Sequence, residues 1–428
     1  MNAAHDLPHP FDGLALATQD LSGIACAVHD GTVPVIKQQP SDFLVEEQAL
    51  YHPSGDGEHL YLYVQKSRLT THSCARILAE HFRVDGLSVG YAGLKDTQAI
   101  TRQMFSVHLP GRRREAFSSL EHDRIEVLWS DWHTNKLRRG HLAGNRFSIR
   151  IRNVDPSSAV LAHQCLRVLE RAGVPNYFGP QRFGIGMNNH RVGLALVMQS
   201  WAEAIDLLLG PEKDRIVPPQ SARLETALTK ALARGDSHER ACRMIRPNER
   251  SIFVSALQSA MFNQILSRRI GAGTLGMLVK GDRAQREGQH NTFLVTESSM
   301  ADADLLRDVE AMQVSTTGPM WGPKMQRAAS DVDATELGVL HEFGLADDDL
   351  THMIDLAGDM GAGERRSMRV RVTETDVEGG VDEIGPYVRC AFTLPKGAFA
   401  TSVLREIIKC DASLRSNADS TAPDRVVS

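Results

Sequence analysis

Asp96 is the residue best suited to chemistry in this chain, and it lies in the run YAGLKDTQAITRQ at residues 91–103. An aspartate is ionised at neutral pH, and carboxylates act as nucleophiles in glycosyl chemistry. Gly93 lies three residues earlier, and glycine can adopt backbone dihedrals that are closed to other residues. We therefore expect a tight loop that presents this acid, although an isolated Gly-Leu-Lys-Asp more often marks an ordinary turn.

A second informative run, GVPNYFGPQRFG, occupies residues 173–184. It has neither the period of a strand nor that of a helix, and its composition is typical of a buried loop with a specified shape. Gln181 and Arg182 could contact backbone phosphate or hold a structural junction. The residues alone leave both roles open.

Both runs, in this order, resemble the TruD family of tRNA pseudouridine synthases. The resemblance extends to four more segments, which are IKQQPSDFLVEE (36–47), RRGHLAGNRFSIRIR (138–152), FVSALQSAMFNQILSRR (253–269) and LPKGAFATSVLREII (394–408). One departure is Pro180, where the family carries a small residue. Colinear motifs from residue 36 to 408 argue against chance similarity.

The resemblance implies that the chain isomerises a uridine of tRNA, at position 13 in the D arm, to pseudouridine. This reaction breaks a C–N glycosidic bond, turns the base and joins its C5 to the ribose. No redox change occurs, so no cofactor is expected. Asp96 matches the family's catalytic aspartate, and Lys37 matches the lysine six residues before Phe43. A cation keeps a carboxylate charged in a water-poor site. Attack at the uracil or at the ribose both stay open.

A flipped base is held by stacking on its faces and by hydrogen bonds along its edge. By resemblance, Phe147 is an active-site phenylalanine and Asn145 contacts substrate with an amide that donates and accepts. Phe43 and Phe399 match further substrate-binding positions, and Lys95 is a second candidate for phosphate contact. Taken without the resemblance, each phenylalanine is more often a core residue.

The histidines and cysteines do not predict a metal site. His5 and His9 give the only HxxxH spacing, and the pairs His72/Cys74 and His163/Cys165 have no further ligands beside them. A structural zinc site needs four ligands and a catalytic one needs three from the protein.

The chain has 428 residues and a net charge of −5. Its length predicts two or three domains, and its charge argues against a protein that coats nucleic acid. Ten Lys and Arg residues nevertheless lie between 112 and 152, beginning with Arg112–Arg114. We interpret this Arg112–Arg152 basic segment as a patch that holds phosphates; the alternative is a solvated charged face.

Six cysteines without a CxxC pair predict reduced thiols. The N-terminus lacks the pattern of a signal peptide, and no run reaches the length of a membrane span. We therefore expect a cytoplasmic protein that does not associate with membranes.

The hydrophobic periodicity predicts an α+β fold with a mixed or antiparallel sheet, because strands follow one another without regular βαβ alternation. Alternation marks strands at 59–65, 105–109, 125–127 and 147–151, and helical spacing marks 71–84, with Thr71 near its N-cap, and 157–172.

The middle of the chain has a different pattern from its two ends. Helical spacing dominates from about 190 to 270, short strands follow at 274–324, short helices at 329–360, and strand alternation resumes at 368–372 and 388–392. We predict a discontinuous pseudouridine synthase catalytic domain at 1–172 and 367–411. A helix-rich inserted TRUD domain would occupy 173–366, and 412–428 would form a polar, disordered tail.

The favoured interpretation is a stand-alone tRNA pseudouridine synthase that acts as a monomer without an obligatory protein partner. One alternative is an RNA-binding or RNA-folding protein on the same scaffold, but such a protein would not need Asp96, Lys37, Asn145 and Phe147 together. A carboxylate-based glycosidase would need a second acid near the first, and none stands out beside Asp96.

Overall fold

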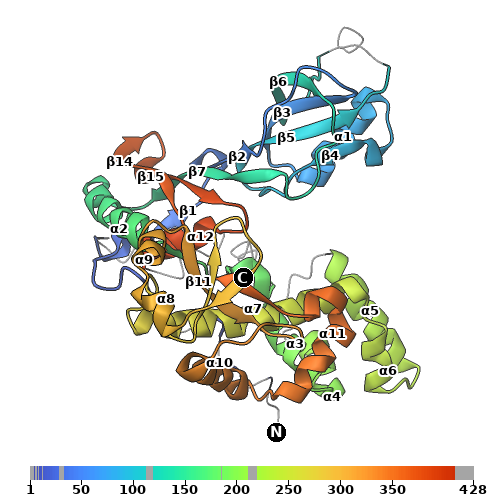
Figure 1. Cartoon of the computed structure of the whole chain (residues 1–428). Coiled ribbons are helices and arrows are strands. Elements are labelled where there is room, and N and C mark those ends of the chain that lie inside the picture. Colours follow the sequence, from blue (N-terminus) through green and yellow to red (C-terminus); the bar gives the residue numbers. More distant parts are fainter. Residues whose placement is uncertain are drawn as a thin grey trace, which may run out of the picture. The chain divides into compact units, whose positions relative to one another are not determined.

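A computed structural model describes residues 4, 7, 9–11, 13–27, 33–111, 119–184, 186–210 and 219–409. The chain divides into two compact units. Thr18–Arg171 and Arg371–Ser428 form the first, which we call the sheet unit, and Met1–Ala17 and Ala172–Val370 form the second, which we call the helix-rich unit. Figure 1 shows the elements of both.

The sheet unit is built on one mixed sheet of nine strands within the described residues. The order is β14-β15-β7-β2-β5-β3-β6, with β1 paired to β7 and β4 paired to β5. Among the described strands of this sheet, β2 and β5 are the one parallel pair, and the other pairs are antiparallel. This confirms the predicted α+β class. The strands are β1 (Val35–Ile36), β2 (Phe43–Ala49), β3 (His59–Ser67), β4 (Val89–Tyr91), β5 (Ile100–His108), β6 (Ile125–His133), β7 (Leu142–Arg152), β14 (Thr373–Asp382) and β15 (Gly385–Pro395).

Helix α1 (Thr71–Phe82) lies beside β4 and β5 (Figure 1). Its buried side chains Cys74, Leu78 and Phe82 belong to one apolar cluster with residues of β3, β5 and β6. Thr70, one residue before the predicted Thr71, is the N-cap, and its side chain accepts a hydrogen bond from Ser73 N.

The described residues of the sheet unit form two further α-helices, α2 (Ala159–Ala172) and α12 (Ala400–Ile408). Helix α12 buries Val403, Leu404 and Ile407. Its Glu406 accepts hydrogen bonds from the backbone NH and the hydroxyl of Thr18, at 2.9 and 2.8 Å. The short 3-10 turns of this unit are η1 (Ile24–Ala27), η2 (Pro40–Asp42), η3 (Gly86–Ser88) and η5 (Pro156–Ser158).

The helix-rich unit is organised around α7 (Pro247–Gly271), whose residues from Phe253 to Met261 are all buried. Asn263 of α7 donates to and accepts from the backbone of Phe178. The other helices are α3 (Asn189–Val197), α4 (Trp201–Leu209), α5 (Pro219–Ala233), α6 (His238–Arg243), α8 (Glu297–Ala301), α9 (Ala303–Glu310), α10 (Ser330–Glu342) and α11 (Leu350–Ala357), with 3-10 turns η6 (Pro180–Phe183), η7 (Asp347–Asp349) and η8 (Gly358–Gly361).

Two small sheets also belong to this unit. One has the order β10-β9-β11-β12, and the other pairs β13 with β8. Their strands are β8 (Val174–Pro175), β9 (Arg283–Arg286), β10 (Thr292–Leu294), β11 (Val314–Met320), β12 (Glu364–Ser367) and β13 (Arg369–Val370).

The described part of Met1–Ala17 groups by its contacts with the helix-rich unit, whereas the catalytic domain is expected at 1–172, and these domain bounds stay a prediction. Polar and aromatic contacts hold the described part of this segment. Ala15 N donates to Ser267 Oγ at 2.8 Å, and Ala15 O accepts from Tyr177 Oη at 3.0 Å. The ring of Phe11 packs edge-on against that of Phe183 with 5.5 Å between centroids. The sequence pattern of this lead-in has no periodicity that could have shown these contacts.

Candidate catalytic site

The structure pairs Asp96 with Lys37 in the sheet unit, through an ion pair between Lys37 Nζ and Asp96 Oδ2. The two side chains are 25% and 12% exposed, so the carboxylate is accessible while its cation is largely covered. Lys37 Nζ also lies 4.5 Å from the centroid of the Phe43 ring. The other carboxylate oxygen of Asp96 accepts from Gln98 N at 2.9 Å. Three sequence-predicted site residues are therefore in direct contact.

Lys37 has a backbone φ of +59°. This left-handed conformation costs a residue with a side chain roughly 1–2 kcal/mol. It places the lysine directly after the short strand β1, where the chain leaves its pairing with β7. The local strain is consistent with a side chain that is aimed at a particular partner.

The loop between β4 and β5 (residues 92–99), which carries Asp96 and which we call the catalytic loop after this candidate residue, is fixed from both sides. The hydroxyl of Thr71 accepts from Lys95 N at 3.0 Å and donates to Gln103 Oε1 at 3.0 Å. The amide of Gln103 in turn donates to Gly93 O at 3.2 Å. Thr71 and Gln103 are 2% and 0% exposed, so these bonds are sheltered from water and hold the loop firmly.

Gly93 does not serve the loop through an unusual dihedral, as the sequence suggested, because its φ lies outside the positive range. A Cβ at this position would lie 3.2 Å from Lys95 Nζ and 3.8 Å from Glu47 Oε2. Glycine is therefore used here because a buried ion pair passes close to the backbone.

Lys95 is not available for the phosphate contact that its position beside Asp96 suggested. Its Nζ lies 2.6 Å from Glu47 Oε2, and the two side chains are 5% and 2% exposed. Burial raises the pKa of Glu47, and the charge of Lys95 opposes this. The pair braces the loop against strand β2, since Lys95 lies on the loop and Glu47 on the strand. Removing either charge would leave the other buried without a partner.

Lys66 is a member of the site that the sequence interpretation missed. It is 1% exposed, and its Nζ donates to Leu69 O at 2.7 Å and to Asp96 O at 3.4 Å. Burial lowers its pKa to about 8, which the charge of Asp96 partly opposes. A signal was present, since Lys66 follows Leu60, Leu62 and Val64 on the buried face of β3.

Strands β2 and β7 bring Phe43, Phe147 and Asn145 to one region of the sheet. Phe43 pairs with Ile149, Val45 with Phe147 and Glu47 with Asn145 in the antiparallel register. The rings of Phe43 and Phe147 meet edge to face at 6.4 Å and 76°. Phe43 is 5% exposed and Phe147 is 7% exposed. Lys37, Phe43 and Phe147 thus form one continuous cluster.

Asn145 has a buried side-chain oxygen, Oδ1, for which the described part of the structure gives no hydrogen-bond donor. A buried acceptor without a donor costs about 1–3 kcal/mol, so such an atom calls for an explanation. Gly144 precedes it, and a Cβ there would lie 2.2 Å from Leu394 O of β15. Gly144 therefore allows β15 to approach closely, and Oδ1 of Asn145 has no donor among the described residues.

Phe399 is the N-cap residue of α12 and is half-buried. It lies four residues after Pro395, which pairs with Gly144 in the register of β15 and β7. This places it near the end of β7 that carries Asn145. Its contact with a substrate stays a prediction.

The Arg112–Arg152 basic segment is only partly available for phosphate. Arg112–Arg114 lie outside the described residues. Arg152 is 1% exposed and binds Asp42 at 2.6 Å together with an acid of β14. Arg146 and Arg150 also pair with acids of β14. These three arginines occupy alternate positions of β7, where each meets an acidic side chain. Their ion pairs therefore hold β7 to its neighbours and are not directed at a phosphate.

Arg138 and Arg139 are exposed and lie next to the catalytic loop. Gly140 N donates to Ala92 O at 2.9 Å, which joins their turn to the start of the loop. The guanidinium of Arg139 lies over the ring of Tyr91 at 5.8 Å. Within the described residues of the segment, Arg138 and Arg139 thus offer two exposed cations beside this loop.

The PNYFGPQRFG run lies in the helix-rich unit and has extensive structural contacts. Tyr177, Phe178 and Phe183 are each less than 5% exposed. Arg182 donates to Ser255 Oγ of α7 at 3.0 Å, and burial lowers its pKa. Of the two roles that the sequence left open, the contacts favour the structural one.

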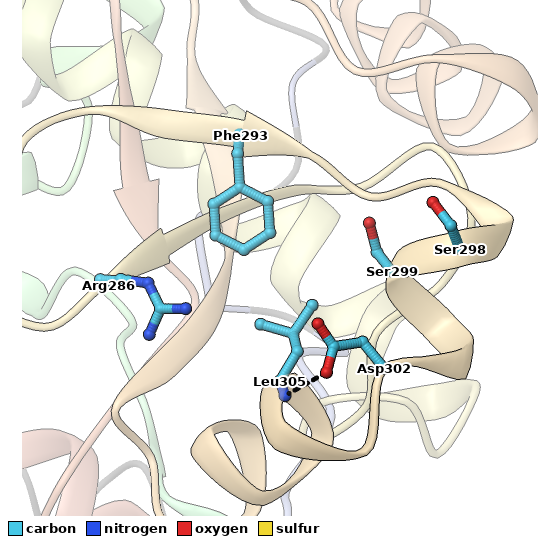
Figure 2. A pocket seen from close by; sticks show the side chains of 6 residues that line it. All are labelled: Arg286, Phe293, Ser298, Ser299, Asp302 and Leu305. Carbon is cyan, nitrogen blue, oxygen red and sulfur yellow. Dashed lines mark hydrogen bonds between the residues drawn. The ribbon is translucent and has the colours of Figure 1, made fainter.

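An open pocket of about 470 Å³ also lies in the helix-rich unit (Figure 2). Its polar groups already have partners, since Arg286 pairs with Asp308 at 2.7 Å and Asp302 caps α9. Its lining is Arg286, Phe293, Ser298, Ser299, Asp302 and Leu305. It contains none of the residues that the sequence motifs singled out.

The described residues contain neither a cluster of metal-binding side chains nor a membrane-spanning helix. No group of three or more His, Cys, Asp or Glu side chains among them could hold a metal ion. None of the helices in the described ranges is long and apolar enough to cross a membrane.

The accessible Asp96 pairs with the covered Lys37, which lies over the Phe43 ring, and this arrangement is a candidate site for carboxylate chemistry. The family model described as tRNA pseudouridine synthase D (TruD) matches residues 23–218 and 215–407. The tRNA pseudouridine synthase D of Geotalea daltonii is 36% identical over 404 residues, which is 89% of this chain and 97% of that protein. A tRNA pseudouridine synthase D of Thermus thermophilus is 34% identical over 397 residues, with 92% of each chain covered.

A solved structure agrees with these relatives. A Methanosarcina mazei protein described as tRNA pseudouridine synthase D (TruD) superposes with a TM-score of 0.78 at 25% identity, over 95% of this chain and 99% of that one. The chain therefore belongs to the TruD family of tRNA pseudouridine synthases and is an isomerase.

Proposed function

We propose that this enzyme isomerises a uridine in the D arm of tRNA, at position 13, and that Asp96 is its nucleophile. The observation that carries the proposal is the Lys37–Asp96 ion pair beside the Phe43 ring, on a loop fixed by buried hydrogen bonds. The relatives' names supply tRNA as the substrate class. The exposed Arg138–Arg139 turn supplies cations for its backbone.

The reaction begins when the carboxylate of Asp96 attacks the target nucleotide, either at C1′ of the ribose or at C6 of the uracil. The glycosidic C–N bond breaks and its electron pair stays on N1 of the base. The base turns, and a new bond joins its C5 to C1′. After attack at C1′, the bond between Asp96 and C1′ breaks as the C5–C1′ bond forms; after attack at C6, Asp96 leaves C6 once the new bond is in place. In both cases Asp96 returns to a free carboxylate, C5 loses its proton and N1 gains one. Both positions of attack give the same atom balance.

The neighbouring side chains have separate roles in this proposal. Lys37 is the cation that pairs with the carboxylate of Asp96 when the nucleotide displaces water from the site. The Phe43 and Phe147 rings pack beside the flipped base. The unsatisfied Oδ1 of Asn145 accepts the N3–H of uracil, and Phe399 contacts the nucleotide from the start of α12. A monomer in the cytoplasm is part of the same proposal; for the cytoplasm, the four described cysteines, which are free and buried, fit a reducing compartment.

The test is pseudouridine mapping on a tRNA transcript that carries U13, beside a matched transcript with cytidine at that position. We expect one pseudouridine, at position 13, in the first transcript and none in the second. A modification elsewhere in the tRNA would contradict the D-arm assignment. Tight binding with no pseudouridine in either would favour the RNA-binding or RNA-folding alternative.

A further inference from the structure

Leu94 is an exposed apolar side chain on the catalytic loop. It is 57% exposed and lies two residues before Asp96. Single exposed leucines are normal on protein surfaces, so its exposure alone means little. What distinguishes Leu94 is that the backbone on both sides of it is held in place.

The preceding and following residues fix the direction of Leu94. Gly93 O accepts from the buried Gln103 amide at 3.2 Å, and Lys95 N donates to the buried Thr71 hydroxyl at 3.0 Å. The Lys95 side chain continues into the ion pair with Glu47. Turning Leu94 inward would break these buried bonds, which is costly in a low-dielectric surrounding. The leucine is therefore a rigid apolar projection.

The surroundings of this projection suit an RNA helix. Gly140 N donates to Ala92 O, so the exposed Arg138–Arg139 turn lies against the start of the same loop. Cations that meet phosphates give RNA affinity and register. Apolar side chains that enter a base stack beside such contacts separate neighbouring bases.

We infer that Leu94 is the wedge that enters the RNA base stack when the target uridine is flipped toward Asp96. The inference rests on the proposed function and extends it to the step before chemistry. Extruding a nucleotide costs a few kcal/mol of lost stacking and pairing. A leucine that fills the vacated space keeps the base from returning, without contacting the reacting atoms.

The test compares Leu94→Ala with Leu94→Met and with Leu87→Ala. Leu87 is the matched control, since it is 84% exposed in the same unit and lies on η3. Single-turnover pseudouridine formation should fall more than about tenfold for Leu94→Ala, stay near wild type for Leu94→Met and be unchanged for Leu87→Ala. Thermal unfolding should be unchanged in all three variants.

Two RNA substrates separate flipping from chemistry. In a tRNA with 2-aminopurine on the 3′ side of the target uridine, the fluorescence of 2-aminopurine should increase when wild type binds, because this base loses its stacking neighbour. The increase should be smaller with Leu94→Ala. A tRNA with an abasic site at that neighbour should restore the Leu94→Ala rate to within about threefold of wild type, since less stacking must be broken.

The inference would be overturned if wild type and Leu94→Ala gave equal increases in 2-aminopurine fluorescence. It would also be overturned if Leu94→Ala lost as much rate on the abasic tRNA as on the unmodified one. Absence of pseudouridine with wild-type enzyme would instead contradict the proposed function. In that case the 2-aminopurine signal of the variants would still decide whether Leu94 opens the stack.

Discussion

Truncating Phe147 to alanine removes a ring that packs against two others in the sheet unit. Its centroid lies 6.4 Å from that of Phe43 and 5.6 Å from that of Phe392, and its side chain is 7% exposed. Removing a buried phenylalanine ring costs about 3–5 kcal/mol through lost transfer energy and the remaining cavity. We expect the free energy of unfolding of Phe147→Ala to fall by that amount.

A second loss should appear in the rate. If the exposed part of Phe147 packs beside the flipped base, losing it costs on the order of 1–3 kcal/mol. That corresponds to roughly 5- to 150-fold in the single-turnover rate per folded molecule. Phe147→Leu keeps most of the apolar volume, so it should lose less stability than Phe147→Ala while still lacking the ring.

Phe392→Ala is the matched control. Phe392 is the direct cross-strand partner of Phe147 on β15 and is 0% exposed, so it cannot reach a substrate. Its truncation should reduce stability as much as that of Phe147 and leave turnover per folded molecule unchanged.

The assay combines urea unfolding with single-turnover pseudouridine formation on tRNA, normalised to the folded fraction from near-UV circular dichroism. Normal turnover per folded molecule in both Phe147 variants would remove Phe147 from the site. A rate loss in Phe392→Ala equal to that in Phe147→Ala would show that the effect travels through the core and does not involve substrate contact.

The catalytic loop and the cations around it give three further predictions. Lys95→Met should lower the free energy of unfolding, measured with urea, by about 3–5 kcal/mol because Glu47 is left buried and unpaired. Adding Glu47→Gln to the same chain should recover much of this loss. No recovery would contradict the bracing role. The free energy of unfolding of wild type, relative to that of Lys66→Met, should rise by up to roughly 3 kcal/mol between about pH 8 and about pH 10.5. The reason is that the folded pKa of Lys66, about 8, lies below its unfolded value of 10.5. A difference that does not change with pH would contradict the burial argument. Replacing Arg138 and Arg139 with Gln should weaken tRNA binding. It should also reduce the slope of log K against log salt concentration by somewhat under one for each phosphate that is no longer neutralised. An unchanged slope would mean that the two arginines belong to a solvated charged face.

Alternation of apolar and polar residues predicted strands β3, β5, β6, β7 and β15 of the sheet unit, but not β1, β2 or β4. Residues 59–65 alternate and form most of β3, and the same alternation carries Lys66 onto the buried face. Strand β14 was not predicted, because most of its residues are exposed or half-buried and few are apolar. It lies at the edge of the sheet, where one side of the strand has no partner within the described order.

The pairing of Lys37 with Asp96 was predicted only through the family resemblance. The two residues are separated by 59 positions, and no local pattern connects them. The mistaken role of Lys95 has a related cause, because a loop without periodicity does not show which side chains turn inward. Glu47 offered a partial signal, since it follows Phe43 and Val45 on the buried face of β2 and therefore needs a cation.

The most direct test of the central claim compares Asp96→Asn with Asp85→Asn. Each aspartate accepts a hydrogen bond at Oδ1 from the backbone NH two residues further on, at 2.9 and 2.7 Å, so both changes remove a charge from a similar turn. Asp96→Asn should abolish pseudouridine formation in single-turnover reactions on tRNA while changing the tRNA Kd by less than about tenfold. Asp85→Asn should retain the wild-type rate. Measurable pseudouridine with Asp96→Asn, at a tRNA concentration that saturates binding, would contradict the claim that Asp96 is the nucleophile.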